Sequence, residues 1–172
     1  GLPLVAAIVV NYGTPALTID CLESLLRSAD VVARVIIIDN NSRDDSVARI
    51  GAHCHGRAGV VLHAGAINDG YTGGNNTGVD LARALGARYA LIVNSDTVVA
   101  PDCLRFLLDE VENEPGVEMV HPRIFFGDAP EPLWFGGSAF SPWSGLPVSI
   151  GLRVRASSAA STRRIAAVRP ST

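Results

Sequence analysis

The stretch that decides the fold class is Val35-Ile36-Ile37-Ile38-Asp39-Asn40-Asn41-Ser42. Its four consecutive β-branched residues predict a strand, Arg34–Ile38, and the change to a carboxylate and two amides marks where that strand stops. Val5–Val10 is a similar apolar run, suited to a strand that is buried on both faces. The two runs predict the first strands of one sheet.

Strand and helix signals alternate along the first 120 residues. Between the first two strands, Thr14 can cap a helix with Pro15 as its first residue, and the helix has an apolar stripe of Leu17, Cys21, Leu22 and Leu25. This alternation with short connections predicts an α/β domain with a mainly parallel sheet flanked by helices. Further strands are predicted at Val60–His63, at Tyr89–Val93, which is expected to be buried, and at Glu118–His121. Further helices are predicted at Asp44–Ile50, from the glycine-rich stretch to Leu85 with Gly86 as its stop, and after Pro101.

Three predicted strands end in polar residues: the first in Asn11-Tyr12, the second in Asp39, and the fourth in Asn94-Ser95-Asp96. Ligands of open parallel sheets bind outside the carboxyl ends of the strands, so these residues predict one shared polar rim. Asp39 there can accept hydrogen bonds from a base NH or a ribose hydroxyl. The alternative is that Asp39 caps the next helix or stabilises a turn through its own carboxylate.

Asp96 follows the apolar run Leu91-Ile92-Val93, and we expect it on the strand next to that of Asp39. A carboxylate at a strand end can hold a divalent cation whose other ligands are substrate phosphates and water, as is usual for magnesium. Such a cation offsets the charge of a diphosphate and stabilises it as a leaving group. The alternative is an ordinary turn aspartate before Thr97.

The glycine-rich stretch runs from Asn68 to Gly78 and contains Gly73-Gly74-Asn75-Asn76. It lacks the spacing of a dinucleotide fingerprint. Its glycines would allow a ligand to approach the backbone closely, and the start of the following helix would supply amide donors. A flexible turn is the alternative.

Cysteine and histidine supply no strong motif. Three cysteines at wide spacing predict neither a disulfide framework nor a zinc site, and favour a reducing compartment. His53-Cys54-His55 has no second ligand cluster, so a surface loop is favoured over a metal site. We expect the protein to be cytoplasmic, free or peripheral to the inner face of the membrane.

Composition excludes several classes of function. The 172 residues are 48% hydrophobic, but no apolar run reaches the roughly 20 residues of a transmembrane segment. The absence of lysine excludes Schiff-base and P-loop chemistry. All 17 acidic residues precede Gly151, whereas residues 153–172 hold five arginines and no acid. This tail has no aromatic residue or binding motif, so we expect no nucleic-acid partner and a tail that is disordered or foreign to the fold.

In order, these motifs resemble family 2 glycosyltransferases of the GT-A fold, particularly bacterial rhamnosyltransferase-like members. Asn94-Ser95-Asp96-Thr97 occupies the place of the family's metal-binding DxD motif, in the NPDT-like variant that these members often carry. Its first position is an amide, a departure from DxD. Tyr71 and Thr72 are further departures, within a glycine-rich segment that resembles GFAGGNNxG. The other matching segments are Ile8–Pro15, Cys21–Leu26, Val35–Ser42 and Trp134–Gly137, so the resemblance covers about residues 4–137.

The resemblance implies a donor site. Asn11, Tyr12 and Asp39 would contact the base and ribose of a UDP- or dTDP-sugar, and Gly73 to Asn76 would lie against the donor. Asp96 would bind Mn²⁺ or Mg²⁺ on the diphosphate. The predicted nucleotide-sugar-binding residues are Asn11, Tyr12, Asp39, Asn41, Gly73, Gly74, Asn75, Asn76 and Asn94, with Asp96 as the metal ligand.

The reaction that the resemblance implies is inverting transfer of the sugar to an acceptor hydroxyl, in a glycan or lipid-linked glycan of cell-surface polysaccharide synthesis. The family's general base is a later carboxylate, but no Asp, Glu or His follows Gly137. We therefore expect residues 1–137 to be the donor-binding domain of a truncated enzyme, residues 138–172 to be an irregular tail, and the chain to be inactive alone. No residue is assigned as catalytic.

Two alternative functions make different predictions. A regulatory or scaffolding domain that kept a GT-A-like fold would show no metal-dependent nucleotide binding. A sugar-phosphate nucleotidyltransferase would need basic residues near the first strand and a lysine, whereas the first turn here is Asn11-Tyr12-Gly13-Thr14-Pro15.

Overall fold

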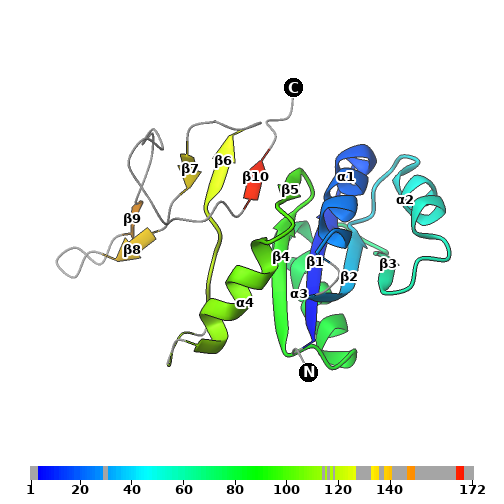
Figure 1. The fold of residues 1–172 in the computed structure, drawn as a ribbon. Helices are drawn as coiled ribbons and strands as arrows, with labels where there is room; N and C mark the ends of the chain where they lie inside the picture. The colour runs from blue at the N-terminus through cyan, green and yellow to red at the C-terminus, as the bar shows by residue number, and fades with distance from the viewer. Residues whose placement is uncertain are drawn as a thin grey trace. The chain divides into compact units, whose positions relative to one another are not determined.

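The computed structural model describes residues 4–28, 31–113, 115, 117, 119–126, 133–135, 138–140, 147–149 and 166–168 (Figure 1). The chain divides into two compact units, Gly1–Thr97 and Val98–Thr172, and each unit is described by itself. No helix within the described ranges is long and apolar enough to cross a membrane.

The first unit contains a four-stranded parallel sheet with the strand order β3-β2-β1-β4. In Figure 1, β1 lies between β2 and β4. Residue by residue, Val10 is the partner of Ile38 on one side and of Asn94 on the other. The predicted α/β fold with a mainly parallel sheet is confirmed. The elements are β1 (Val5–Asn11), α1 (Pro15–Leu26), β2 (Val32–Asp39), α2 (Ser46–Cys54), β3 (Val60–Ala64), α3 (Gly70–Ala84) and β4 (Tyr89–Asn94).

Helices cover both faces of this sheet. α1 and α2 pack together on one face. α3 connects β3 at one edge of the sheet to β4 at the other, and it packs against β1 and β2 on the opposite face. Alternate residues of β1 therefore face different helices. Ala6, Ile8 and Val10 pack with Ala82 of α3, so Asn11 points toward the face of α1.

Two glycines let α3 lie close against β1. A Cβ on Gly74 would come within 2.9 Å of Val10 Cγ1, and a Cβ on Gly78 would come within 2.3 Å of Ile8 Cγ2. The glycine-rich stretch is thus helical from Gly70 onward, rather than a turn before a helix. Gly86 has a positive φ of 78° and ends the helix as predicted.

Three predicted elements of this unit are corrected. The second helix is longer than Asp44–Ile50 and shifted, because it begins at Ser46 and continues to Cys54. Thr14 occupies the N-cap position of α1, but its side chain makes no capping hydrogen bond. β4 is an edge strand with a solvent-exposed side, and Ile92 is 51% exposed, so this strand is not fully buried.

The second unit begins within β5 (Thr97–Val99) and contains α4 (Cys103–Asn113), whose buried face includes Leu104, Leu107 and Leu108. The predicted strand Glu118–His121 is wrong, since residues 119–121 are not in a strand and Met119 is 87% exposed. The strand begins after Pro122, which has no backbone N–H to donate. The remaining strands are β6 (Ile124–Phe126), β7 (Leu133–Phe135), β8 (Ser138–Phe140), β9 (Pro147–Ser149) and β10 (Ala166–Val168).

These strands form a sheet of order β5-β10-β6-β7 and a separate antiparallel pair of β8 and β9. Trp134 lies in a strand, within the loop or short strand predicted there, whereas Gly136 and Gly137 lie outside the described residues. The described parts of the predicted irregular tail, 138–172, include three short strands, β8, β9 and β10. Most of this tail lies outside the described residues. The domain division at residue 137 stays a prediction.

The close approach of α3 to β1 predicts opposite effects of alanine at two helical glycines. Gly78→Ala places a methyl group against the fully buried Ile8 and is expected to lower the free energy of unfolding by about 1–3 kcal/mol. Gly51→Ala is the matched control, because its Cβ would lie 3.6 Å from Leu62, an ordinary contact. It is expected to stabilise by about 0.4–1 kcal/mol through helix propensity. Urea unfolding measures both, and equal effects of the two changes would contradict this packing.

Candidate functional site

The carboxyl edge of the parallel sheet holds the predicted strand-end residues, but not in the predicted arrangement. β1 lies between β2 and β4, so Asp39 and Asp96 follow strands that are not neighbours. Asn11 is the register partner of Asp39, and Val10 is the partner of Asn94. Because side chains alternate between faces, Asn11 and Asp39 point toward α1, whereas Asn94 points toward α3. The predicted single rim is therefore divided between the two faces.

A buried hydrogen-bond network joins the ends of β1 and β2. Asn11 Nδ2 donates to Asp39 Oδ1 at 2.7 Å and to Ser42 Oγ at 3.2 Å. Ser42 N donates to Asp39 Oδ2 at 2.9 Å, so Asp39 stabilises the turn after β2 through its own carboxylate. Both Asn11 and Asp39 are buried, so their side chains support the turns at the sheet edge and are not exposed to a ligand.

Helix α1 completes the network. Thr18 Oγ1 donates to Asn11 Oδ1 at 2.8 Å, and Thr14 N donates to the same oxygen at 3.3 Å. The amide of Asn11 thus uses both its donors and its acceptor within the protein. The sequence reasoning missed Thr18, although a hydroxyl within the buried stripe of the helix was the available signal.

Exposed groups surround this buried network. Tyr12 directly follows Asn11 and is 56% exposed, and Gly13 N donates to Ser42 Oγ at 2.9 Å. Asn41 is half-buried and has a positive φ of 57°, which Asn tolerates better than most residues. The network therefore fixes two turns whose side chains a ligand can reach.

A second amide network joins β2 to the start of α3. Asn40 Nδ2 donates to Asn68 Oδ1 at 2.9 Å and to the Gly70 carbonyl at 3.0 Å. Asp69 N donates back to Asn40 Oδ1 at 3.2 Å. Nothing in the sequence pattern indicated this link, because the partners lie 28 to 30 residues apart.

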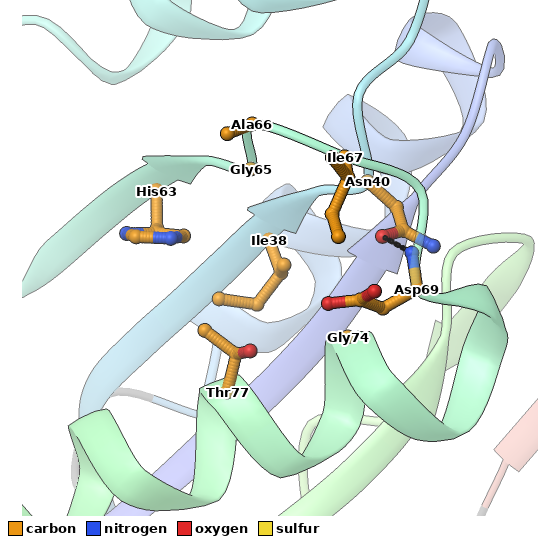
Figure 2. Close-up of a pocket in the computed structure, with 9 residues that line it drawn as sticks. All are labelled: Ile38, Asn40, His63, Gly65, Ala66, Ile67, Asp69, Gly74 and Thr77. Atoms are coloured by element: carbon orange, nitrogen blue, oxygen red, sulfur yellow. Dashed lines mark hydrogen bonds between the residues drawn. The ribbon is translucent and has the colours of Figure 1, made fainter.

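A pocket of about 220 Å³ opens beside this second network, between β2, β3 and α3. Figure 2 shows His63 reaching in from β3, Thr77 from α3, and Asp69 beside Asn40. Of the predicted site residues, Gly74 lines it. The other lining residues are Ile38, Gly65, Ala66 and Ile67.

The predicted donor-facing residues Gly73 to Asn76 lie in the first two turns of α3. Asn75 is buried, and its Nδ2 donates to the Tyr71 carbonyl at 2.9 Å. Its Oδ1 has no hydrogen-bond partner among the described residues. Asn76 is exposed. Ligand contacts by these residues stay a prediction.

The end of β4 carries the two positions that correspond to the metal-binding motif. Tyr71 donates its hydroxyl hydrogen to Asn94 Oδ1 at 2.8 Å, so the first position already has a protein partner. Asp96 is half-buried near Cys21 of α1. Burial first, and then the negative charge of Asp96, raise the pKa of the Cys21 thiol to about 12.

Asp96 stays the predicted ligand of a metal ion, and the structure shows what such an ion would need beside it. Within the described ranges, no three His, Cys, Asp or Glu side chains gather as a metal site. Asp96 could therefore hold an Mn²⁺ or Mg²⁺ ion only together with diphosphate oxygens and water, which is the usual arrangement for Mg²⁺.

His53-Cys54-His55 is not a surface loop, since His53 and Cys54 form the last turn of α2. His53 Nε2 lies 2.6 Å from Glu23 Oε1 of α1, and Arg57 also pairs with this carboxylate. The hydrogen bond from His53, followed by that from Arg57, lowers the pKa of Glu23. The cluster joins α1 to α2 on the face of the sheet that these two helices cover.

Residues 6–156 match the family described as "Glycosyl transferase family 2". The chain is 30% identical over 110 residues to the succinoglycan biosynthesis protein ExoO of Rhizobium meliloti (strain 1021). That match covers 64% of this chain and 30% of ExoO, so the chain spans less than a third of this relative.

Two solved structures share the fold. The S. aureus protein TarS (residues 1–349), solved in complex with UDP, matches with a TM-score of 0.54 and 16% identity, over 69% of this chain and 38% of that one. The mannosyltransferase PcManGT from Pyrobaculum calidifontis, in complex with GDP-Man and Mn²⁺, matches with a TM-score of 0.58 and 19% identity, over 76% of this chain and 37% of that one. The parallel sheet flanked by helices is thus of the GT-A type.

The buried network predicts a pH-dependent effect of one isosteric change. Asn11→Asp places a carboxylate where an amide now donates to Asp39, and is expected to lower the free energy of unfolding by about 3 kcal/mol at neutral pH. The difference from wild type should shrink as the pH falls, because the folded variant takes up a proton between the two carboxylates. Denaturant unfolding at several pH values measures this.

The control for this change is Asn76→Asp, the same substitution at an exposed position in the second turn of α3. It is expected to change the unfolding midpoint little at any pH. A neutral effect of Asn11→Asp at pH 7 would contradict the role given to the network.

Proposed function

The chain belongs to glycosyl transferase family 2, and we propose that its first unit binds a nucleotide diphosphate sugar at the carboxyl ends of β1, β2 and β4. The observation that carries this proposal is the buried network of Asn11, Asp39 and Ser42, which holds the strand ends rigid and leaves Tyr12 exposed above it. A rigid edge with reachable aromatic, amide and carboxylate groups favours ligand binding there.

Asp96 and Tyr12 have different roles in the proposal. Asp96 binds a divalent cation, Mn²⁺ or Mg²⁺, through its carboxylate. When bound, this cation would offset the charge of the diphosphate and stabilise it as a leaving group. Tyr12 is exposed enough to stack on the base. Asn11 and Asp39 act chiefly by positioning Tyr12 and the half-buried Asn41.

The strand order suggests how a donor would lie. A diphosphate at Asp96, after β4, leaves the nucleoside to extend across β1 toward β2 and β3. The pocket of about 220 Å³ lies on that side, lined by Asn40, His63 and Asp69. We assign the base end of the donor to this side of the sheet and the sugar to the side of Asn94 and Asp96.

The full reaction would be inverting transfer of the sugar to a hydroxyl of a glycan or lipid-linked glycan, in cell-surface polysaccharide synthesis. The curated relative is named for succinoglycan biosynthesis, which agrees with this class of product. The rhamnosyltransferase-like resemblance makes dTDP-rhamnose the first donor to test, beside UDP- and GDP-sugars. We further propose that this donor-binding portion transfers little by itself, because no Asp, Glu or His follows Gly137 to serve as the general base.

One observation favours a second candidate function, a regulatory or scaffolding role. Two of the predicted base and ribose contacts, Asn11 and Asp39, are buried with protein partners. A domain that had lost donor binding would keep such a network for stability alone. Metal-dependent nucleotide binding separates the two functions.

Calorimetry with UDP, GDP and dTDP, with and without Mn²⁺ or Mg²⁺, tests the donor site. The wild-type chain is expected to bind at least one nucleotide more tightly with metal, and Asp96→Ala to weaken that binding about tenfold or more. The control is Asp80→Ala, which removes an exposed carboxylate of α3 that pairs with Arg83 of the same helix. Unchanged metal-dependent binding in Asp96→Ala would exclude Asp96 as the metal ligand.

Transfer is tested separately from binding. The chain is expected to release nucleoside diphosphate from UDP-GlcNAc, GDP-mannose or dTDP-rhamnose no faster than slow hydrolysis, with or without an acceptor glycan. Turnover at about 1 per second or more, a rate typical of enzymes, would show that a sufficient base is present.

A further inference from the structure

We propose that Tyr71 is a positioning residue of the donor site. Its hydroxyl donates a hydrogen bond to the amide oxygen of Asn94 and thereby turns the amide NH₂ toward the diphosphate of the bound donor. The inference rests on the proposed function and assigns a role to the first position of the Asn94-Ser95-Asp96 motif. That position would be a hydrogen-bond donor to an anion, and not a ligand of the metal ion.

Two departures from the family pattern meet in this contact. The motif carries an amide at position 94, and the glycine-rich segment carries Tyr71 where the resembling pattern has phenylalanine. The two positions are 23 residues apart in the sequence, yet the Tyr71 hydroxyl donates to Asn94 Oδ1 at 2.8 Å. A phenylalanine would have no hydroxyl for this bond, so the two departures are physically coupled.

The fold explains why the two residues meet. Asn94 is the register partner of Val10, and both side chains therefore point toward α3. Gly74 brings the first turns of α3 against the same Val10. Tyr71 lies in the first turn of this helix, from which its side chain reaches the end of β4.

The backbone of Tyr71 holds the start of the helix in place. Its carbonyl accepts a hydrogen bond at 2.9 Å from Nδ2 of the buried Asn75. Tyr71 is 53% exposed, and the hydrogen bond from its hydroxyl lies at the surface, where a ligand above the sheet edge could reach it. Tyr71 thus contacts two amides of the predicted donor site, one through its backbone and one through its hydroxyl.

The two ends of the Asn94 amide have different binding preferences. The oxygen of Asn94 is its only group that a divalent cation would bind, and its NH₂ is its only group that would donate to a phosphate oxygen. A phenol that donates to the oxygen competes with metal binding there and leaves the NH₂ free. Asp96 then remains the protein's metal ligand, and Asn94 contributes to donor binding without metal.

The test measures binding of UDP, GDP and dTDP by calorimetry, without metal and with Mn²⁺. Tyr71→Phe is expected to weaken metal-free binding about threefold to tenfold, since one orienting hydrogen bond is lost. Asn94→Asp should weaken metal-free binding further, because a second carboxylate faces the diphosphate, but should strengthen Mn²⁺-dependent binding. The matched control is Tyr89→Phe, which removes a hydroxyl from the opposite end of β4 and should bind as wild type does.

A ligand-free measurement tests the positioning step alone. The side-chain amide resonances of Asn94, observed by ¹⁵N NMR, should shift in Tyr71→Phe and not in Tyr89→Phe. Unchanged Asn94 resonances, unchanged metal-free affinity in Tyr71→Phe, or wild-type binding that is undetectable without metal would each overturn the inference. Wild-type protein that binds no nucleotide even with Mn²⁺ would overturn the proposed function, and this inference with it.

Discussion

The buried carboxylate of Asp39 is the constraint on which the sheet edge depends. A carboxylate taken out of water is costly unless hydrogen bonds replace its hydration. Here Asn11 Nδ2 and Ser42 N supply those bonds, and Thr18 in turn fixes the amide of Asn11. Three elements, β1, β2 and α1, are therefore held together at their ends by one network. The same network fixes the conformations of the turns that follow β1 and β2.

This constraint separates residues that hold the site from residues that can touch a ligand. Asn11 and Asp39 are buried with partners and belong to the first group. Tyr12 and Asn94 are exposed and Asp96 is half-buried, so they belong to the second. The close contact of α3 with β1, which only glycine permits, adds an exposed tyrosine beside Asn94. The sheet edge therefore combines a buried layer of supporting side chains with an outer layer of polar side chains that a ligand can reach.

Several elements followed directly from local patterns, and others did not. The strands at Val5–Asn11 and Val32–Asp39 were recognisable from their β-branched runs, and the positive φ of Gly86 matches its predicted role as a helix stop. The second helix was predicted too short, because the hydrogen bonds of its last turn involve residues without a clear apolar period. Residues 118–121 were predicted as the last strand of the repeating strand–helix pattern. Met119 is 87% exposed instead, and the next strand begins at Ile124, after Pro122.

The sequence by itself determined the fold class, the strand ends and the identity of the polar residues there, because buried strands and their terminations are local features. Tertiary structure decided the strand order, which places β1 between the strands that precede Asp39 and Asp96. It also decided which face each side chain occupies, so that Asn11 became a buried support and Asn94 a partner of Tyr71. Such contacts join residues more than twenty positions apart, and only the pairing of parallel strands and the packing of helices on them bring these residues together.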